Sequence, residues 1–162
     1  MPVTYNHIAT TRLTSSQQEI NFNSIPQIYT DIILIANCTG VSSTGAAQSM
    51  RFNGDTGYNY NGIYMIDDAA GLAINDNRAI IGAVNGTFST SFPFMTFVHI
   101  QNYTSSYYKS FISRGGYPDY EISITANTWR STAPITSIMW GQYGTATMNV
   151  GTICSLYGIK KA

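Results

Sequence analysis

The sequence predicts an all-β protein, folded as an antiparallel two-sheet β-sandwich that is jelly-roll-like. Short strand-like runs alternate with Gly, Asn, Asp and Pro turn signals, and no segment keeps a helical period for more than two turns. At 162 residues the chain is long enough for one sizeable core. We therefore expect a single β-sandwich domain over residues 19–162, preceded by residues 1–18 as a polar N-terminal arm or an edge strand.

The first half of the chain contains four expected strands. Residues 19–22 alternate polar and apolar side chains, as a half-buried strand does. Residues 29–36 contain four consecutive Ile and Leu side chains at 32–35, which predict a buried central strand. The next two strands are expected at 47–52, which is stopped by an Asn-Gly-Asp turn signal, and at 63–66, which follows another turn.

The stretch from residue 67 to residue 86 is open to two interpretations. Residues 67–73 fit either a short helix capped by an Asp or an irregular loop. Residues 79–84 predict a strand that ends at Asn85-Gly86, a dipeptide typical of hairpin turns.

The second half contains five expected strands, at 94–103, 107–113, 120–126, 135–140 and 152–159. Residues 94–103 have apolar side chains on both faces, which predicts a central position in a sheet. In the next strand, Lys109 is expected on the outer face. The alternation over 120–126 predicts that Ile122 and Ile124 point inward, with Glu121 and Ser123 outward.

Charge and composition narrow the class of partner. Lys plus Arg and Asp plus Glu number 8 each, so the formal net charge is zero, and we expect neither nucleic acid nor an anionic membrane as a partner. Only 10% of residues are charged while 44% are hydrophobic, which favours an ordered domain with a surface of hydroxyl, amide and tyrosine side chains. Such a surface suits contact with other proteins or with glycans. The N-terminus has no secretory signal, so we expect synthesis in a cytoplasm.

No residue pattern indicates catalysis, a metal or a cofactor, so we expect a protein that is not an enzyme. His7 and His99 are the only histidines, and no G-x-S-x-G nucleophile elbow accompanies them. Cys38 and Cys154 lie in strand-like segments and are expected to be buried reduced thiols, and a metal site is not expected because the sequence has no C-x-x-C motif. Acidic and amide side chains in loops are expected to cap turns, because the EF-hand spacing of a calcium site is absent. These loop residues are Asp55, Asp67, Asp68, Asn75, Asp76 and Asn77.

Several segments together resemble a family of small all-β structural proteins of tailed phages, cyanophages among them. The segments are FNSIPQIYTDIIL at 22–34, RFNGDTGYNY at 51–60, IQNY at 100–103, YKS at 108–110, WRSTAPITSI at 129–138 and SLYGI at 155–159. Proteins of this kind occur as capsid decoration (cement) proteins, and similar modules occur in tail and fibre proteins. The family has no catalytic residues to transfer to this chain.

The resemblance implies a virion component that binds the outside of the assembled head and stabilises contacts between major capsid subunits. The implied partners are the major capsid protein and further copies of this chain, in a homotrimer at three-fold positions of the shell, and the implied location is the capsid surface. The alternative is a carbohydrate-binding adhesin module of a phage tail or fibre. An adhesin needs an exposed aromatic groove, for which the candidates are Trp140, Tyr143, Tyr58 and Tyr60.

Residues that contact the partner are expected in two kinds of place. The polar segment over residues 4–18 is the first candidate for the shell contact, and loop tyrosines are the second, because Tyr is enriched at interface cores. The expected contact residues are Tyr5, His7, Arg12, Tyr58, Tyr60, Tyr107 and Tyr108.

Overall fold

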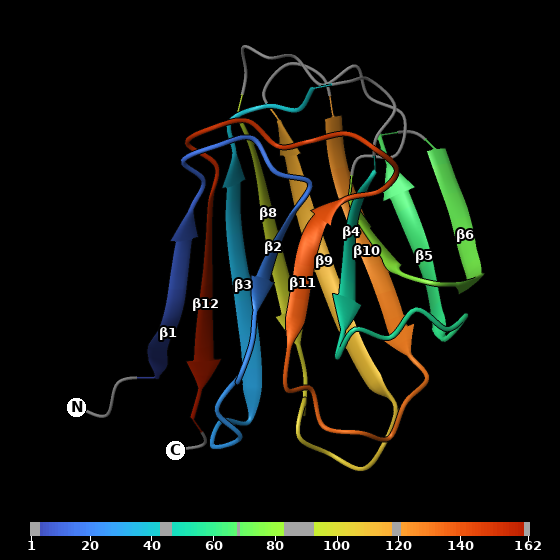
Figure 1. Cartoon of the computed structure of the whole chain (residues 1–162). Coiled ribbons are helices and arrows are strands. Elements are labelled where there is room, and N and C mark those ends of the chain that lie inside the picture. Colours follow the sequence, from blue (N-terminus) through green and yellow to red (C-terminus); the bar gives the residue numbers. More distant parts are fainter. Residues whose placement is uncertain (1–3, 43–46, 68, 83–92, 118–120, 161–162) are drawn as a thin grey trace.

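The computed structural model describes residues 4–42, 47–67, 69–82, 93–117 and 121–160, and these residues form two antiparallel β-sheets without a helix (Figure 1). The predicted all-β sandwich is therefore confirmed. In the described part of the chain, no helix is long and apolar enough to cross a membrane.

The larger sheet has eight strands and the smaller sheet has four. In spatial order, the large sheet consists of β1 (Tyr5–Arg12), β12 (Ile153–Ile159), β3 (Asp31–Cys38), β8 (Phe94–Ile100), β9 (Lys109–Tyr117), β10 (Glu121–Trp129), β5 (Tyr60–Ile66) and β6 (Ala69–Asp76). The small sheet consists of β2 (Glu19–Phe22), β11 (Ile138–Gln142), β4 (Gln48–Phe52) and β7 (Ala79–Gly82). From β1 to β5 the chain alternates between the two sheets, as it does in jelly rolls.

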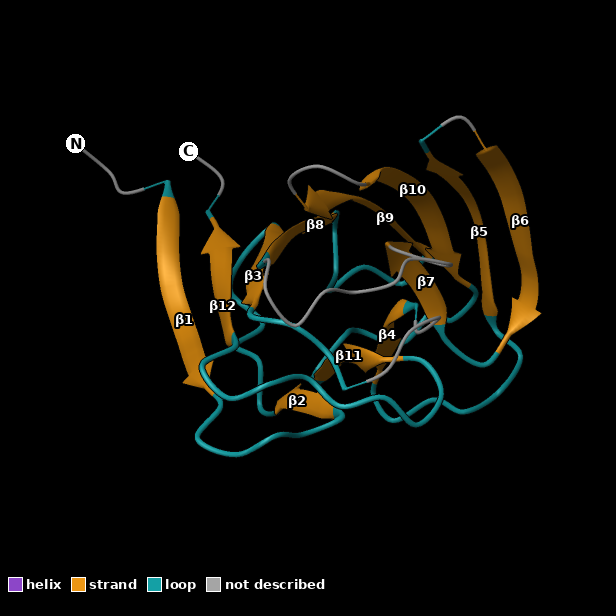
Figure 2. Cartoon of the chain, turned by 90° about the horizontal axis from the view of Figure 1, so that it is seen from above, coloured by secondary structure: helices purple, strands orange, loops and turns teal. Residues whose placement is uncertain are grey.

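The large sheet curves around the small one, so that one of its faces is covered and the other is open (Figure 2). We call the covered face the inner face and the open one the outer face. The pairing of β1 with β12 places the first and last strands of the chain side by side at one edge of the large sheet (Figure 1). Residues 5–12 are thus an edge strand of the sandwich, which is one of the two forms expected for the N-terminal segment.

The core lies between the two sheets. As predicted, β3 and β8 are central strands, and Ile32, Leu34 and Val98 on their inner faces are completely buried. The small sheet contributes Phe52 and Trp140, which are equally buried. Residues 69–76 form the edge strand β6, so the expected short helix or loop at 67–73 is wrong for the part that the structure describes. The Asn85-Gly86 turn lies outside the described residues.

One end of the sandwich is closed by Trp129, the last residue of β10. Its indole ring lies against Phe52 and Tyr60, with ring centroids 5.4 and 6.4 Å away. Its Nε1–H donates a hydrogen bond of 2.7 Å to Oδ2 of Asp55, in the loop between β4 and β5. The same carboxylate accepts hydrogen bonds from the Gly57 amide at 2.8 Å and from Asn59 Nδ2 at 3.0 Å. Asp55 therefore ties its loop to the core.

This contact makes the stability of the protein dependent on pH. Burial by itself would raise the pKa of Asp55, but the hydrogen bonds from Trp129, Asn59 and Gly57 outweigh it, so the pKa lies below its usual value. The folded protein then binds a proton less readily than the unfolded chain. The contribution of Asp55 is therefore complete above the usual carboxyl pKa of about 4 and disappears as pH falls through the lowered folded value.

We expect Asp55→Asn to lower the free energy of unfolding by about 1.5 kcal/mol at neutral pH, because an amide cannot replace the charged acceptor of these donors. The difference from wild type should vanish at a pH at which Asp55 is protonated. Urea unfolding of both proteins along a pH series measures this. A difference that stays constant down to strongly acidic pH would contradict the assignment.

Both cysteines lie on the inner face and are free thiols, as expected. Burial raises the pKa of the Cys38 thiol and of the Cys154 thiol. Since the thiolate is the reactive form, neither residue should react with an aromatic disulfide reagent in the native protein, and both should react after unfolding in urea. Rapid modification of one thiol in the native state would show that its strand opens locally.

Candidate functional site

The faces of β10 are the reverse of what its sequence predicts. Ile122 and Ile124 point to the outer face and are largely exposed, whereas Ser123 and Thr125 are buried on the inner face. The prediction that the two isoleucines point inward and Ser123 outward is therefore wrong. The side chain of Glu121 lies outside the described part of the structure.

A chain of hydrogen bonds explains why small polar side chains occupy the inner face here. Asn127 Nδ2 donates to the Ile80 carbonyl at 3.1 Å and to Thr125 Oγ1 at 2.7 Å. Ser113 Oγ lies 2.5 Å from Thr125 Oγ1 and donates to the Ile81 carbonyl at 2.7 Å. These side chains of β9 and β10 thus bind backbone carbonyls of β7, in the opposite sheet. Because these buried donors have partners, small polar side chains are stable on the inner face. The isoleucines of β10, which alternate with them, lie on the outer face.

Aliphatic side chains collect on the outer face of five strands, β6, β5, β10, β9 and β8. Their rows follow the strand register, which pairs Ile63 with Leu72, Ile124 with Met65, and Met95 with Gly116. The exposed fractions of the eight large side chains range from 52 to 72%. We call this set the apolar half of the outer face: Ile63, Met65, Leu72, Ile74, Met95, Ile112, Ile122 and Ile124.

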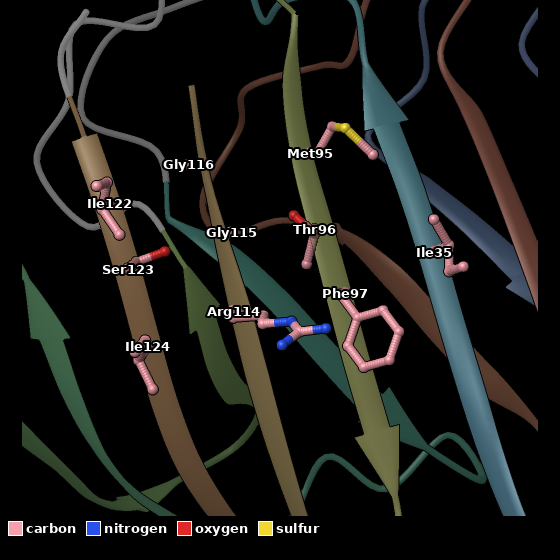
Figure 3. Close-up of a pocket in the computed structure, with 10 residues that line it drawn as sticks. All are labelled: Ile35, Met95, Thr96, Phe97, Arg114, Gly115, Gly116, Ile122, Ser123 and Ile124. Atoms are coloured by element: carbon pink, nitrogen blue, oxygen red, sulfur yellow. The ribbon is translucent and has the colours of Figure 1, made fainter. Parts of the chain in front are cut away.

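Two shallow grooves cross the apolar half. One of them, of about 520 Å³, lies over Gly116, whose neighbours in the register are Met95 on β8 and Ile122 on β10. Figure 3 shows these side chains flanking the bare backbone of β9, with Arg114 extended toward Phe97. The guanidinium carbon of Arg114 lies 4.6 Å from the centre of the Phe97 ring. Arg114 is the only charged side chain among the described residues that line either groove.

The rest of the outer face, formed by β3, β12 and β1, carries polar and aromatic side chains alongside isoleucines such as Ile35, which lines the groove over Gly116. His7 Nε2 lies 2.8 Å from Thr10 Oγ1, and Thr10 Oγ1 lies 2.8 Å from Ser155 Oγ, so a hydrogen-bonded row runs from β1 to β12. The His7 ring also contacts the ring of Tyr157 edge to face at 5.6 Å. At the border with the apolar half, His99 Nε2 lies 2.9 Å from Asp31 Oδ2 and so joins β8 to β3.

The structure places six of the seven expected contact residues on the surface, in two regions. Tyr5, His7 and Arg12 are exposed along β1. Tyr58 is exposed in the β4–β5 loop, and Tyr107 and Tyr108 are exposed in the β8–β9 loop. In Figure 1 the two loops lie at the lower end of the molecule, and β1 forms one edge of the large sheet.

Tyr60 is a correction to the expected contact residues. Its side chain is 1% exposed, and its hydroxyl approaches the Phe52 backbone, accepting a hydrogen bond of 2.9 Å from the amide. Burial of the ring raises the pKa of Tyr60. A side chain packed in the core in this way cannot reach a partner without unfolding the end of the sandwich.

Lys109 is a second correction, because its side chain is completely buried instead of facing outward. Its Nζ donates to the carbonyl groups of Tyr107 at 2.5 Å and Ser131 at 3.4 Å. The ammonium also lies 5.9 Å from the centre of the Trp129 ring, within reach of a cation–π interaction. Burial lowers the pKa of Lys109. This lysine therefore anchors the β8–β9 loop.

The aromatic candidates of the adhesin alternative are not gathered on one exposed face. Trp140 and Tyr60 are both core residues, and only Tyr58 and Tyr143 remain accessible. The exposed Tyr107 and Tyr108 instead line a small polar groove with Gln101, Asn102, Ser105 and Ser110.

The carboxylates of Asp55 and Asp76 accept from nearby backbone amides, as expected for turn capping, whereas Asp67 binds the amide of a distant residue on β10. Asp76 Oδ1 accepts from the amides of Asn77 and Arg78, and Asp67 Oδ1 accepts from the amide of Ile122. Over the residues that the structure describes, no cluster of three or more His, Cys, Asp or Glu side chains could hold a metal ion. Asp68 lies outside this part of the chain.

Comparisons with known proteins add no relative to this picture, since the chain matches no protein-family model and no curated protein. The apolar half of the outer face is the feature that the sequence did not reveal. Alternation along β10 separates its residues into two sets but does not say which set faces the small sheet. We take the apolar half as the candidate functional site, since contiguous exposed apolar surface of this kind marks interaction sites.

Proposed function

We propose that this chain is a structural protein of a phage virion, which decorates the outside of the assembled head and stabilises contacts between major capsid subunits. The observation that supports an assembly role is the apolar half of the outer face, where eight large aliphatic side chains are more than half exposed. Exposed aliphatic side chains are unfavourable in water, and contact with another protein surface removes them from water. The resemblance of the six sequence segments supports the virion as the setting.

The proposed mechanism is stabilisation by binding. A protein that binds the assembled shell, and not its free subunits, lowers the free energy of the assembled state. Repeated copies on a symmetric shell multiply a modest contact energy, because every further contact within one oligomer forms at high effective concentration. The proposed unit is a homotrimer at the three-fold positions of the shell. The exposed residues of β1, Tyr5, His7 and Arg12, are the proposed shell contact.

Quantitative mass spectrometry of purified virions tests this function through the copy number of the chain relative to the major shell protein. We expect the copy number of this chain to stand in a simple ratio to the copy number of the major shell protein. A few copies per particle would instead place the chain in the tail or a fibre and favour the adhesin alternative. Absence from the virion would overturn the proposal.

The shell contact can be tested separately by cosedimentation with heads that lack the chain. Arg12→Glu is expected to weaken binding to heads because it reverses the charge at the end of the exposed edge strand. Ile28→Glu is the control, since it places the same carboxylate at an exposed site in the β2–β3 loop, outside both β1 and the apolar half. Equal binding of Arg12→Glu and wild type would remove this end of β1 from the contact.

A further inference from the structure

We propose that the apolar half of the outer face is the surface through which copies of this chain bind one another. This inference names the occupant of the candidate site, and it rests on the proposed function only for its biological setting. Three properties of the apolar half favour a second copy over an unrelated protein, namely its area, its lack of charge and its shape.

The area of the apolar half matches that of a stable contact between identical chains. A fully exposed aliphatic side chain presents about 100 Å² of apolar surface, so eight of them at the exposures found here present about 500 Å². Interfaces of homodimers are about 65% apolar. A contact that covers the apolar half would therefore bury about 800 Å² on each copy, which is the standard size of a stable interface.

The charge distribution also favours a second copy. Arg114 is the only charged side chain lining the grooves in the described residues, and its guanidinium is stacked on Phe97. The face therefore has almost no charge pattern with which to select a charged partner. The chain has zero formal net charge, so two copies meet without long-range repulsion. An interface of this kind resembles a protein core divided in two, which is typical of permanent homo-oligomers.

The relief of the face is complementary to itself. Ile122 and Ile124 form a ridge on β10, and the missing side chain at Gly116 leaves a groove directly beside the ridge on β9. A second copy that approaches with the same face presents a ridge to each groove. Figure 3 shows the side chains of Ile122 and Ile124 on β10, next to the backbone of β9 at Gly115 and Gly116. Aliphatic side chains fill such a groove better than a polar ligand does, because its lining is mostly hydrocarbon.

Sedimentation equilibrium of the 162-residue chain tests the inference with two variants and one matched control. Ile122→Glu and Ile63→Glu each put a carboxylate into the proposed contact. Ile28→Glu makes the same change in the β2–β3 loop, where Ile28 is 68% exposed against 72% for Ile122. We expect an oligomer for wild type and Ile28→Glu, and a dissociation constant at least about 100-fold higher for the two face variants. Far-UV circular dichroism and the thermal midpoint establish that each variant is folded.

A wild-type chain that stays monomeric at micromolar concentrations would overturn the inference, as would an oligomer that neither face variant dissociates. A dimer dissociated by these substitutions would support the inference while removing the homotrimer from the proposed function. Conversely, absence of the chain from virions would remove the proposed function and leave the self-association result intact. The two proposals therefore fail separately.

Discussion

Trp129→Ala is expected to lower the free energy of unfolding by about 3–5 kcal/mol, the cost typical of deleting a large buried aromatic side chain. The ring of Trp129 contacts Phe52 and Tyr60, so its removal leaves a cavity between these side chains. Asp55 would also lose the donor that contributes to its lowered pKa. Urea unfolding followed by far-UV circular dichroism measures the loss.

Trp129→Phe separates the contribution of the buried ring from that of the hydrogen bond to Asp55. Phenylalanine keeps most of the buried ring but cannot donate to Asp55, so we expect a loss of about 1–2 kcal/mol. Trp129→Ala also removes the aromatic face beneath Lys109, whose burial then has less compensation. If Trp129→Ala costs no more than Trp129→Phe, the ring does not close this end of the core.

Asn127→Leu is expected to lower the free energy of unfolding by about 3 kcal/mol, although it replaces a buried polar side chain with an apolar one of similar size. The substitution removes the hydrogen bonds to the Ile80 carbonyl and to Thr125. The Ile80 carbonyl would lose this donor and Thr125 Oγ1 would keep only Ser113 as a partner, which costs more than the added hydrophobic burial gains. A branched side chain would also crowd Gly62, which lies against Asn127.

The matched change on the other face of the same strand is Ile124→Thr, which replaces an exposed aliphatic side chain with a polar one of similar shape. We expect a change within about 0.5 kcal/mol, as for most surface substitutions. Both substitutions should be made in the Ile122→Glu chain, so that unfolding is not coupled to self-association. A stabilising Asn127→Leu together with a strongly destabilising Ile124→Thr would mean that the faces of β10 are reversed from those described.

The sequence predicts much of the fold because long apolar runs and turn signals are local features. The run at residues 32–35 identifies β3 as central, and apolar residues on both faces do the same for β8. Neither prediction depends on knowing which strand lies next to which. The edge strand β6 was missed, because its small side chains and Asp residues also fit a loop or a short helix.

The orientation of β10 could not be read from the sequence, because it depends on the opposite sheet. Isoleucine would ordinarily face the core, but the carbonyl groups of Ile80 and Ile81 in β7 require donors at that place. Ser113 and Asn127 supply these donors from the inner face. Ile122 and Ile124, which alternate with the inward-facing residues of β10, then point outward. Lys109 is buried for a related reason, since the Tyr107 and Ser131 carbonyls and the Trp129 ring lie around its ammonium. Each of these partners is brought into place by tertiary structure.

The reversed faces connect the fold to the proposed function. Buried, hydrogen-bonded polar side chains and exposed aliphatic side chains occur on opposite faces of the same strands, β9 and β10. The fold is stable with this arrangement, and the outer face remains available for another surface. The apolar half is thus a consequence of how the two sheets bind each other, and it is the part of the molecule that assembly would bury.

The most direct test of the central claim, that protein covers the apolar half, uses two methionines already present on it. Met65 and Met95 are 60 and 57% exposed in the single chain, whereas Met50 and Met148 are buried in the core. Dilute peroxide oxidises accessible methionines, and mass spectrometry gives the rate at each site. In wild type at concentrations where it is assembled, Met65 and Met95 should be oxidised much more slowly than in the Ile122→Glu variant, while Met50 and Met148 stay protected in both. Equal rates at Met65 and Met95 in the two proteins would contradict the account.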